Sequence, residues 1–156
     1  MSKAYASAVL DAPVDVVWEV VGDFLGIDKW MSGIGVCERI GDVPNNTVGC
    51  VRRLVFSRDG ATVVQRLLSR DVERMTFSYT LADTNLGFSD YVARVRVVPV
   101  TTTDQTFIEW AGQVGLVEDE AGEEQRAIMR EAYSIGLSDL AATLKARKEQ
   151  AAGSKS

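Results

Sequence analysis

The chain has 156 residues, of which 46% are hydrophobic and 25% charged, and its net charge at pH 7 is −5. This length and composition predict one soluble globular domain over residues 1–156. Because no basic cluster occurs, we expect neither nucleic acid nor an anionic membrane as a partner. The apolar runs are far shorter than the roughly 20 residues of a membrane helix. The N-terminus lacks the apolar core of a signal peptide, so the expected location is the cytoplasm.

Histidine is absent from the whole sequence. This removes the commonest metal ligand and the commonest general base at neutral pH, and it excludes Ser–His and Cys–His nucleophile pairs. We therefore expect neither a metal site nor a cofactor. Cys37 and Cys50 lie on either side of a predicted hairpin, where two reduced thiols are the default and a disulfide is the alternative.

In chain order, residues 3–10 are rich in small and β-prone side chains and predict a first strand. Pro13 favours a helix start, and the apolar spacing predicts a helix up to Gly22. Residues 23–31 predict a turn and a second short helix. Beyond Gly33 the spacing of the apolar residues is no longer that of a helix. Turn residues separate six predicted strands: 34–40, 48–57, 61–71, 75–82, 90–98 and 106–114.

Residues 120–148 predict one long amphipathic helix. Apolar residues recur on one face every three or four positions, and acids crowd its start while basic residues gather near its end. A glycine inside a helix costs about 1 kcal/mol against alanine, so Gly136 indicates a packing or spatial reason. We expect a folded core over about 3–148 and a disordered tail over 149–156.

Alternation along the strands predicts which side chains face the long helix. Tyr79 and Tyr91 are expected to point inward on their strands. In the strand 61–71, an outward Gln65 would turn Arg66 into the apolar interior. Either Arg66 is then a site or the assumed register is wrong, since buried arginine is rare without a partner. Arg52 and Arg53 are adjacent, so one of the two is expected to face inward.

Motifs along nearly the whole chain carry a family resemblance. They are Ala12-Pro13 with Val17-Trp18, Val21-Gly22-Asp23-Phe24, Trp30, Val48-Gly49, Arg52-Arg53-Leu54, Gly60 with Val64 and Arg66-Leu67-Leu68, Phe77-Ser78-Tyr79, Asp90-Tyr91, Val95, Glu109-Trp110 and the terminal helix from Gly136-Leu137 to Leu144-Lys145. In their order and spacing, these resemble the SRPBCC superfamily. It spans START lipid-transfer domains, birch-pollen-allergen-like proteins and the polyketide cyclase/dehydrase group, and the last is the most similar.

The resemblance implies an α+β helix-grip fold. It consists of a curved antiparallel sheet of about seven strands, in the order β-α-α-β6-α, wrapped around the long C-terminal helix, with a cavity between them. Three departures remove residues expected in the nearest subgroup. Met31-Ser32 replaces a His-Pro pair, Gln65 replaces a glutamate, and the proline before Asp90-Tyr91 is missing.

The candidate catalytic residues are Arg66, Tyr79 and Tyr91. The candidate ligand-binding residues are Trp30, Arg52, Val64, Phe77, Asp90, Ile108, Trp110, Met129, Tyr133, Gly136 and Leu137. Arg66 could bind a ligand carboxylate or enolate, pair with a buried acid such as Asp90, or simply be exposed. The phenols could donate to a ligand carbonyl, or pack in the core with their hydroxyls bonded to the backbone. At Gly136 the helix is expected to make room for a ligand, with Tyr133 reaching into the space.

Three functions remain open at this point. One is a cofactor-independent cyclase or dehydratase acting on a hydrophobic, oxygenated small molecule. Another is a non-catalytic carrier or sensor of an apolar ligand, and a homodimer is an open alternative for either. Both of these functions call for a cavity of roughly 300 Å³ or more. The third is a partner-binding domain whose cavity is filled by side chains.

Overall fold

The computed structural model describes residues 2–82, 90–114 and 120–153. Its elements follow the predicted order closely. In chain order they are β1 (Ser2–Leu10), α1 (Val14–Val21), the 3₁₀ helix η1 (Phe24–Lys29), β2 (Ile34–Ile40), β3 (Val51–Phe56), β4 (Thr62–Asp71), β5 (Thr76–Leu81), β6 (Val92–Val100), β7 (Gln105–Val114) and α2 (Glu120–Gly153). The predicted helix-grip architecture is therefore confirmed.

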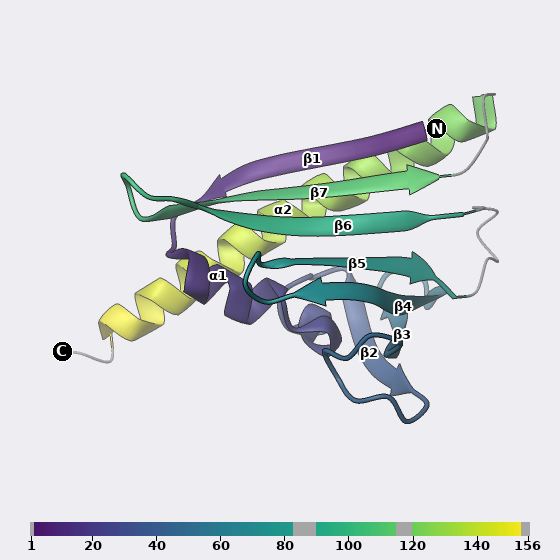
Figure 1. Ribbon diagram of the computed structural model, residues 1–156, viewed down its shortest axis with the longest axis horizontal. Helices are drawn as coiled ribbons and strands as arrows, with labels where there is room; N and C mark the ends of the chain where they lie inside the picture. The colour runs from purple at the N-terminus through teal and green to yellow at the C-terminus, as the bar shows by residue number, and fades with distance from the viewer. Residues whose placement is uncertain (1, 83–89, 115–119, 154–156) are drawn as a thin grey trace.

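All seven strands form one antiparallel sheet in the order β1-β7-β6-β5-β4-β3-β2 (Figure 1). Strands β2 to β7 pair with their neighbours in sequence, as short turns between antiparallel strands require. The turn glycine Gly60 has a φ of 73°, a left-handed conformation that glycine adopts without steric cost. Because β1 pairs with β7, the first and last strands of the sequence lie side by side in the sheet.

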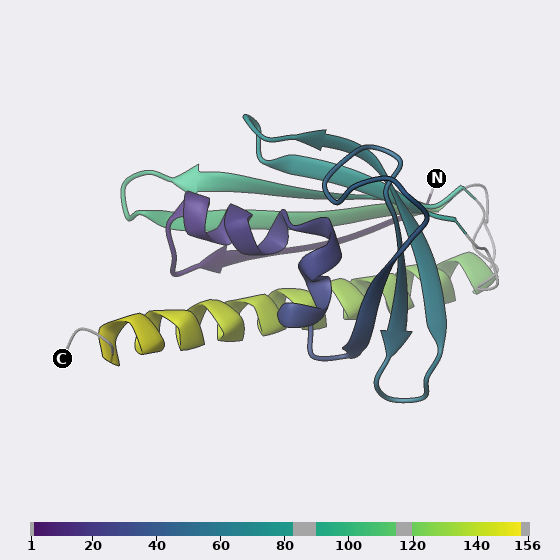
Figure 2. The same ribbon diagram turned by 90° about the horizontal axis from the view of Figure 1, so that it is seen from below.

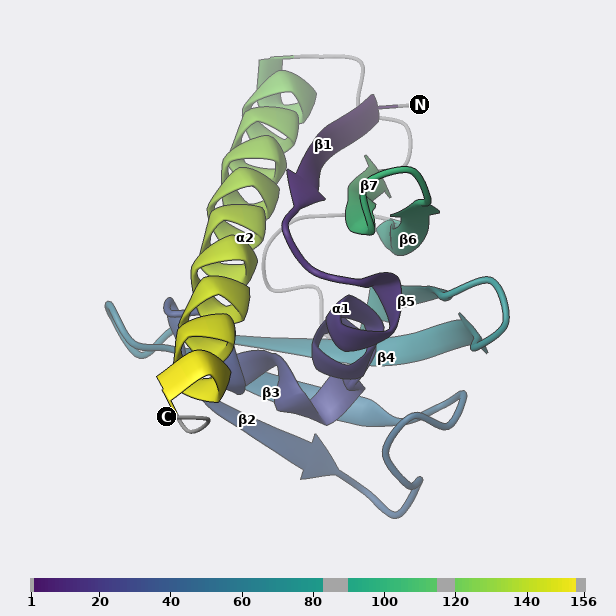
Figure 3. The same ribbon diagram turned by 90° about the vertical axis from the view of Figure 1, so that its left-hand side faces the viewer.

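The long helix α2 runs beside β1 and contacts β7, while the short helices fill the other end of the concave face (Figures 1 and 2). Helix α1 packs on β6 and β7, and η1 packs on β2. Figure 3 shows the sheet bending through its middle strands, with α2 along its open side. The apolar stripe of α2 supplies Met129, Tyr133, Leu137, Leu140 and Leu144 to the core.

A bulge in β4 contributes to the bend. The register of β4 against β5 shifts between Leu67 and Ser69, which leaves Leu68 as the extra residue. Such a bulge bends the strand and changes which side chains face inward. Before it Leu67 is fully buried, and after it Arg70 lies over the ring of Trp18 at 5.2 Å.

Three details differ from the expectations or refine them. Helix α2 continues to Gly153, so the predicted disordered tail is helical at least that far, and residues 154–156 lie outside the described part. Cys37 and Cys50 are free thiols, because Cys37 pairs across the ladder with Leu54 instead. Within residues 2–82, 90–114 and 120–153, no helix is long and apolar enough to cross a membrane.

Candidate functional site

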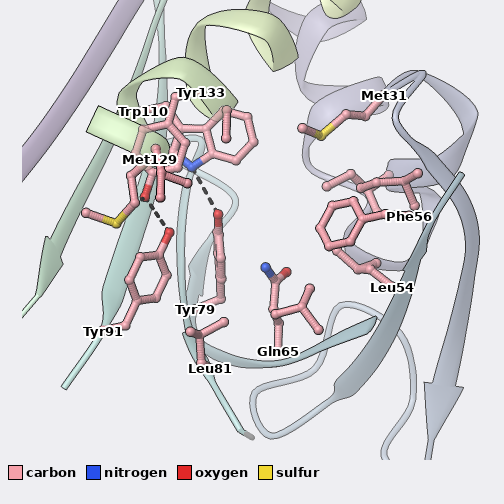
Figure 4. A pocket seen from close by; sticks show the side chains of 15 residues that line it. Met31, Leu54, Phe56, Gln65, Tyr79, Leu81, Tyr91, Trp110, Met129 and Tyr133 are labelled. Atoms are coloured by element: carbon pink, nitrogen blue, oxygen red, sulfur yellow. Dashed lines mark hydrogen bonds between the residues drawn. The ribbon is translucent and has the colours of Figure 1, made fainter. Parts of the chain in front are cut away.

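A pocket opens between α2 and the concave face of the sheet (Figure 4). Its volume is about 150 Å³, and it is partly open to solvent. This is about half of the expected minimum, so the space suits a single-ring molecule or one end of a larger ligand. The lining residues are Ile27, Met31, Ile34, Leu54, Phe56, Val63, Gln65, Tyr79, Leu81, Tyr91, Trp110, Ile128, Met129, Ala132 and Tyr133.

One wall of the pocket is a hydrogen-bonded aromatic cluster. The ring of Trp110 stacks on Tyr133, with centroids 4.8 Å apart and planes 14° from parallel. The indole Nε1 of Trp110 donates a hydrogen bond of 3.0 Å to the hydroxyl of Tyr79. The hydroxyls of Tyr91 and Tyr133 are hydrogen-bonded to each other. Strands β5 and β7, residue 91 and helix α2 therefore converge on this wall (Figure 4).

Two glycines allow this cluster to pack. A Cβ at Gly112 would overlap the hydroxyl of Tyr133, and a Cβ at Gly136 would lie 2.8 Å from Cζ3 of Trp110. Real side chains do not approach so closely, so both positions must lack a Cβ for these rings to sit as they do. The expectation that Gly136 makes room for a ligand is wrong, because the ring of Trp110 takes that space. Tyr133 does reach the pocket, but it crosses over Gly112.

Burial raises the pKa of all three phenols. It is the largest cause for Tyr79, Tyr91 and Tyr133 alike, and for Tyr91 the neighbouring phenols raise the pKa further. At Tyr79 the positive charge of Arg52 partly opposes this rise. All three groups are therefore neutral near pH 7 and offer hydrogen bonds rather than a base.

Among the residues whose burial the structure describes, Arg52 is the charged residue of the interior, with only 2% of its surface exposed. Its Nη1 donates to the backbone oxygen of Phe24 at 2.5 Å, and its Nε donates to Oε1 of Gln65 at 2.8 Å. The guanidinium also lies over the rings of Phe24 and Tyr79, 4.0 and 5.3 Å from their centroids. Burial lowers the pKa of Arg52 below its ordinary value, which still leaves arginine charged at neutral pH.

The predicted site residues divide into three groups. Tyr79, Tyr91, Trp110, Met129 and Tyr133 line the pocket. Others are buried around it without lining it: Trp30, Arg52, Phe77, Ile108, Gly136 and Leu137. Arg66, Val64 and Asp90 lie away from the pocket.

The inward orientation considered for Arg66 is wrong. Arg66 is exposed, whereas Val63, Gln65 and Leu67 occupy the inner face of β4. On the outer face of β4, water solvates the charge of Arg66. Val64 belongs to the same outer face as Arg66 by alternation.

Asp90 is an exposed residue with a φ of 53°, a conformation that aspartate tolerates at turns. Among the arginine pair of β3, Arg52 points inward and Arg53 pairs with Glu38 at the surface. Sequence reasoning did not single out Gln65 or most of the apolar lining: Ile27, Met31, Ile34, Leu54, Phe56, Val63, Leu81, Ile128 and Ala132. Leu67 was the available signal for Gln65. If the apolar Leu67 faces the core, alternation places Gln65, two residues earlier, on the same inner face of β4.

The family described as "Polyketide cyclase / dehydrase and lipid transport" matches residues 1–145. The chain belongs to this polyketide cyclase/dehydrase and lipid transport family. Its helix-grip sheet and the pocket against α2 are thus those of a hydrophobic-ligand-binding fold.

Solved structures of bacterial proteins are similar over nearly their whole length. A protein from Nitrosospira multiformis is 30% identical, with a TM-score of 0.74, covering 90% of this chain and 94% of its own. A Thermobifida fusca protein is 26% identical, with a TM-score of 0.79 and coverage of 90% and 91%. The protein XoxI from Bacillus cereus, at 24% identity, a TM-score of 0.81 and coverage of 94% and 99%, shares the fold.

Proposed function

We propose that this member of the polyketide cyclase/dehydrase and lipid transport family binds a small, largely apolar molecule that carries one oxygen function. The observation that supports this proposal is the composition of the pocket in Figure 4. Leu54, Phe56 and Met31 form an apolar wall, and the amide of Gln65 lies between this wall and the hydroxyl of Tyr79. Apolar burial would supply affinity, and the polar groups would fix orientation.

Binding is better supported than catalysis because the described lining offers no base. No carboxylate lines the pocket among the described residues, and its phenols have raised pKa values. Cyclisation and dehydration both need a proton acceptor. The described walls supply hydrogen-bond donors instead.

A carrier or sensor role follows most directly, with the ligand held in the apolar space. The test is a titration of the purified protein with acetophenone and α-methylstyrene, followed by ligand-observed NMR. Val63 lines the pocket, whereas its neighbour Val64 lies on the other face of β4. The substitution Val63→Phe should therefore abolish binding of both compounds, and Val64→Phe should leave it unchanged. Absence of binding to the wild type, or equal binding by both variants, would reject the pocket as the site.

A cofactor-independent cyclase or dehydratase remains the second candidate. It is favoured by the convergence of the Tyr79 hydroxyl and the Gln65 amide at one side of an apolar space, where donors could polarise a carbonyl. With deuteroxide from the solvent as the proton acceptor, this polarisation predicts that the wild type accelerates exchange of the methyl protons of acetophenone in D₂O relative to Val63→Phe. Equal exchange rates would leave binding as the function.

Native mass spectrometry of the protein as purified from cells addresses the ligand itself. A co-purifying small molecule that is present with wild type and Val64→Phe, and absent with Val63→Phe, would give its mass directly.

A further inference from the structure

We propose that Gln65 selects ligands with a hydrogen-bond-accepting oxygen, such as a carbonyl, and that Arg52 is the positioning residue that enforces this choice. This inference rests on the proposed binding function and specifies the chemistry of the ligand. It is carried by the hydrogen bond between the two side chains and by the position of the Gln65 amide in the pocket.

The orientation of the Gln65 amide follows from the chemistry of arginine. A guanidinium has only N–H donors and no acceptor. The atom that meets Nε of Arg52 at 2.8 Å must therefore be the carbonyl oxygen of Gln65. A flipped amide would place donor against donor and lose a charge-assisted hydrogen bond.

Arg52 itself cannot easily turn away. It is 2% exposed, its Nη1 holds the backbone oxygen of Phe24 at 2.5 Å, and its guanidinium lies 4.0 Å from the centroid of the Phe24 ring. Hydrogen bonding and cation–π contact thus hold it in one place. The carbonyl side of Gln65 is consequently fixed as well.

The amide nitrogen of Gln65 is a donor left for a ligand. Gln65 lines the pocket, and within the described residues its Nε2 has no hydrogen-bond partner (Figure 4). The oxygen of the adjacent Tyr79 already accepts the indole proton of Trp110. A bound oxygen would accept a hydrogen bond from one N–H group of Gln65, whereas a hydrocarbon would leave that group desolvated and unpaired.

The charge of Arg52 also favours a ligand that carries an oxygen. Within the described residues, no carboxylate forms an ion pair or hydrogen bond with it. Its positive potential in a low-dielectric interior favours an electron-rich oxygen nearby.

Acetophenone and α-methylstyrene test this, because they have nearly the same shape and differ in a carbonyl oxygen against a CH₂ group. We expect the wild type to bind acetophenone about tenfold more tightly, the effect of one hydrogen bond. In Gln65→Glu one carboxylate oxygen keeps the bond to Arg52, and the other oxygen, also an acceptor, points into the pocket. Acetophenone should then bind at least about tenfold more weakly, while α-methylstyrene changes little.

Controls separate selectivity from folding and from charge. Gln65→Met should bring the ratio of the two dissociation constants to about one, and Gln150→Glu, an exposed change on α2, should leave the wild-type ratio. Arg52→Met should weaken the preference for acetophenone, because the Gln65 amide is then no longer held in one orientation. Arg52→Lys should restore part of this preference. A merely structural Arg52 would weaken both ligands equally.

Equal binding of the two ligands by the wild type, or an unchanged preference in Gln65→Glu, would overturn the proposal while leaving pocket binding intact. Binding of neither ligand by the wild type would overturn both. Should Arg52→Met not fold, the comparison of Gln65→Glu with Gln65→Met decides alone.

Discussion

At the scale of single residues, Gly112 determines whether the tyrosine pair can form. It lies on β7 directly under the hydroxyl of Tyr133, which is bonded to Tyr91. We expect Gly112→Ala to destabilise the protein by about 1–3 kcal/mol, because a Cβ overpacks this buried contact. Urea unfolding measures the change.

The hydroxyl itself can be tested by a double mutant. Tyr133→Phe removes the atom that a Cβ at 112 would overlap, so it should cost less in the Gly112→Ala background than in the wild type. Gly33→Ala is the matched control, since a Cβ added there would meet no atom within 4 Å beyond its chain neighbours. Strictly additive effects of the two substitutions would contradict the overlap.

At the scale of elements, the approach of α2 to β7 depends on Gly136. Trp110 and Met31 are the nearest side chains to this position on the helix. We expect Gly136→Leu to lower the melting temperature and to weaken acetophenone binding together, because the new side chain displaces the ring of Trp110 from the pocket wall. Thermal unfolding and ligand-observed NMR measure the two effects.

A leucine elsewhere on the same helix provides the control. Ala142→Leu adds a similar volume at an exposed position of α2 and should change neither quantity. Loss of binding in Gly136→Leu at unchanged stability would instead indicate that the leucine enters open ligand space.

At the scale of the whole molecule, the buried phenols couple stability to alkaline pH. Unfolded tyrosines lose their protons near pH 10, whereas Tyr79, Tyr91 and Tyr133 hold theirs to higher pH in the folded state. Their contribution to stability is complete below about pH 10 and is lost as the pH rises through the folded pKa values, because the unfolded state then binds fewer protons.

The free energy of unfolding should therefore fall above about pH 10. In Tyr91→Phe one such group is gone, so the decline should be shallower by up to about 1.4 kcal/mol per pH unit. Urea unfolding at a series of pH values measures both slopes. Identical slopes in the two proteins would show that Tyr91 titrates normally in the folded state.

The architecture could be predicted from the sequence because two periods, two and 3.6 residues, and the turn residues between them are local signals. The inward positions of Tyr79 and Tyr91 follow from the same alternation. The orientation of Gln65 is not determined by the sequence, since alternation in one strand allows either face to point inward and the bulge near Leu68 adds an extra residue. Arg52 is stabilised by a backbone oxygen, an amide and two rings, and only the tertiary structure brings these together.

The stacked pair of Trp110 and Tyr133 gives the molecule a built-in optical reporter. The indole lines the pocket and donates to Tyr79, so a ligand that changes its surroundings should shift both the wavelength and the intensity of tryptophan emission. Trp18 and Trp30 are the other tryptophans of the chain, and their replacement by phenylalanine would make Trp110 the single emitter. Pocket occupancy could then be followed by fluorescence in real time without any attached dye.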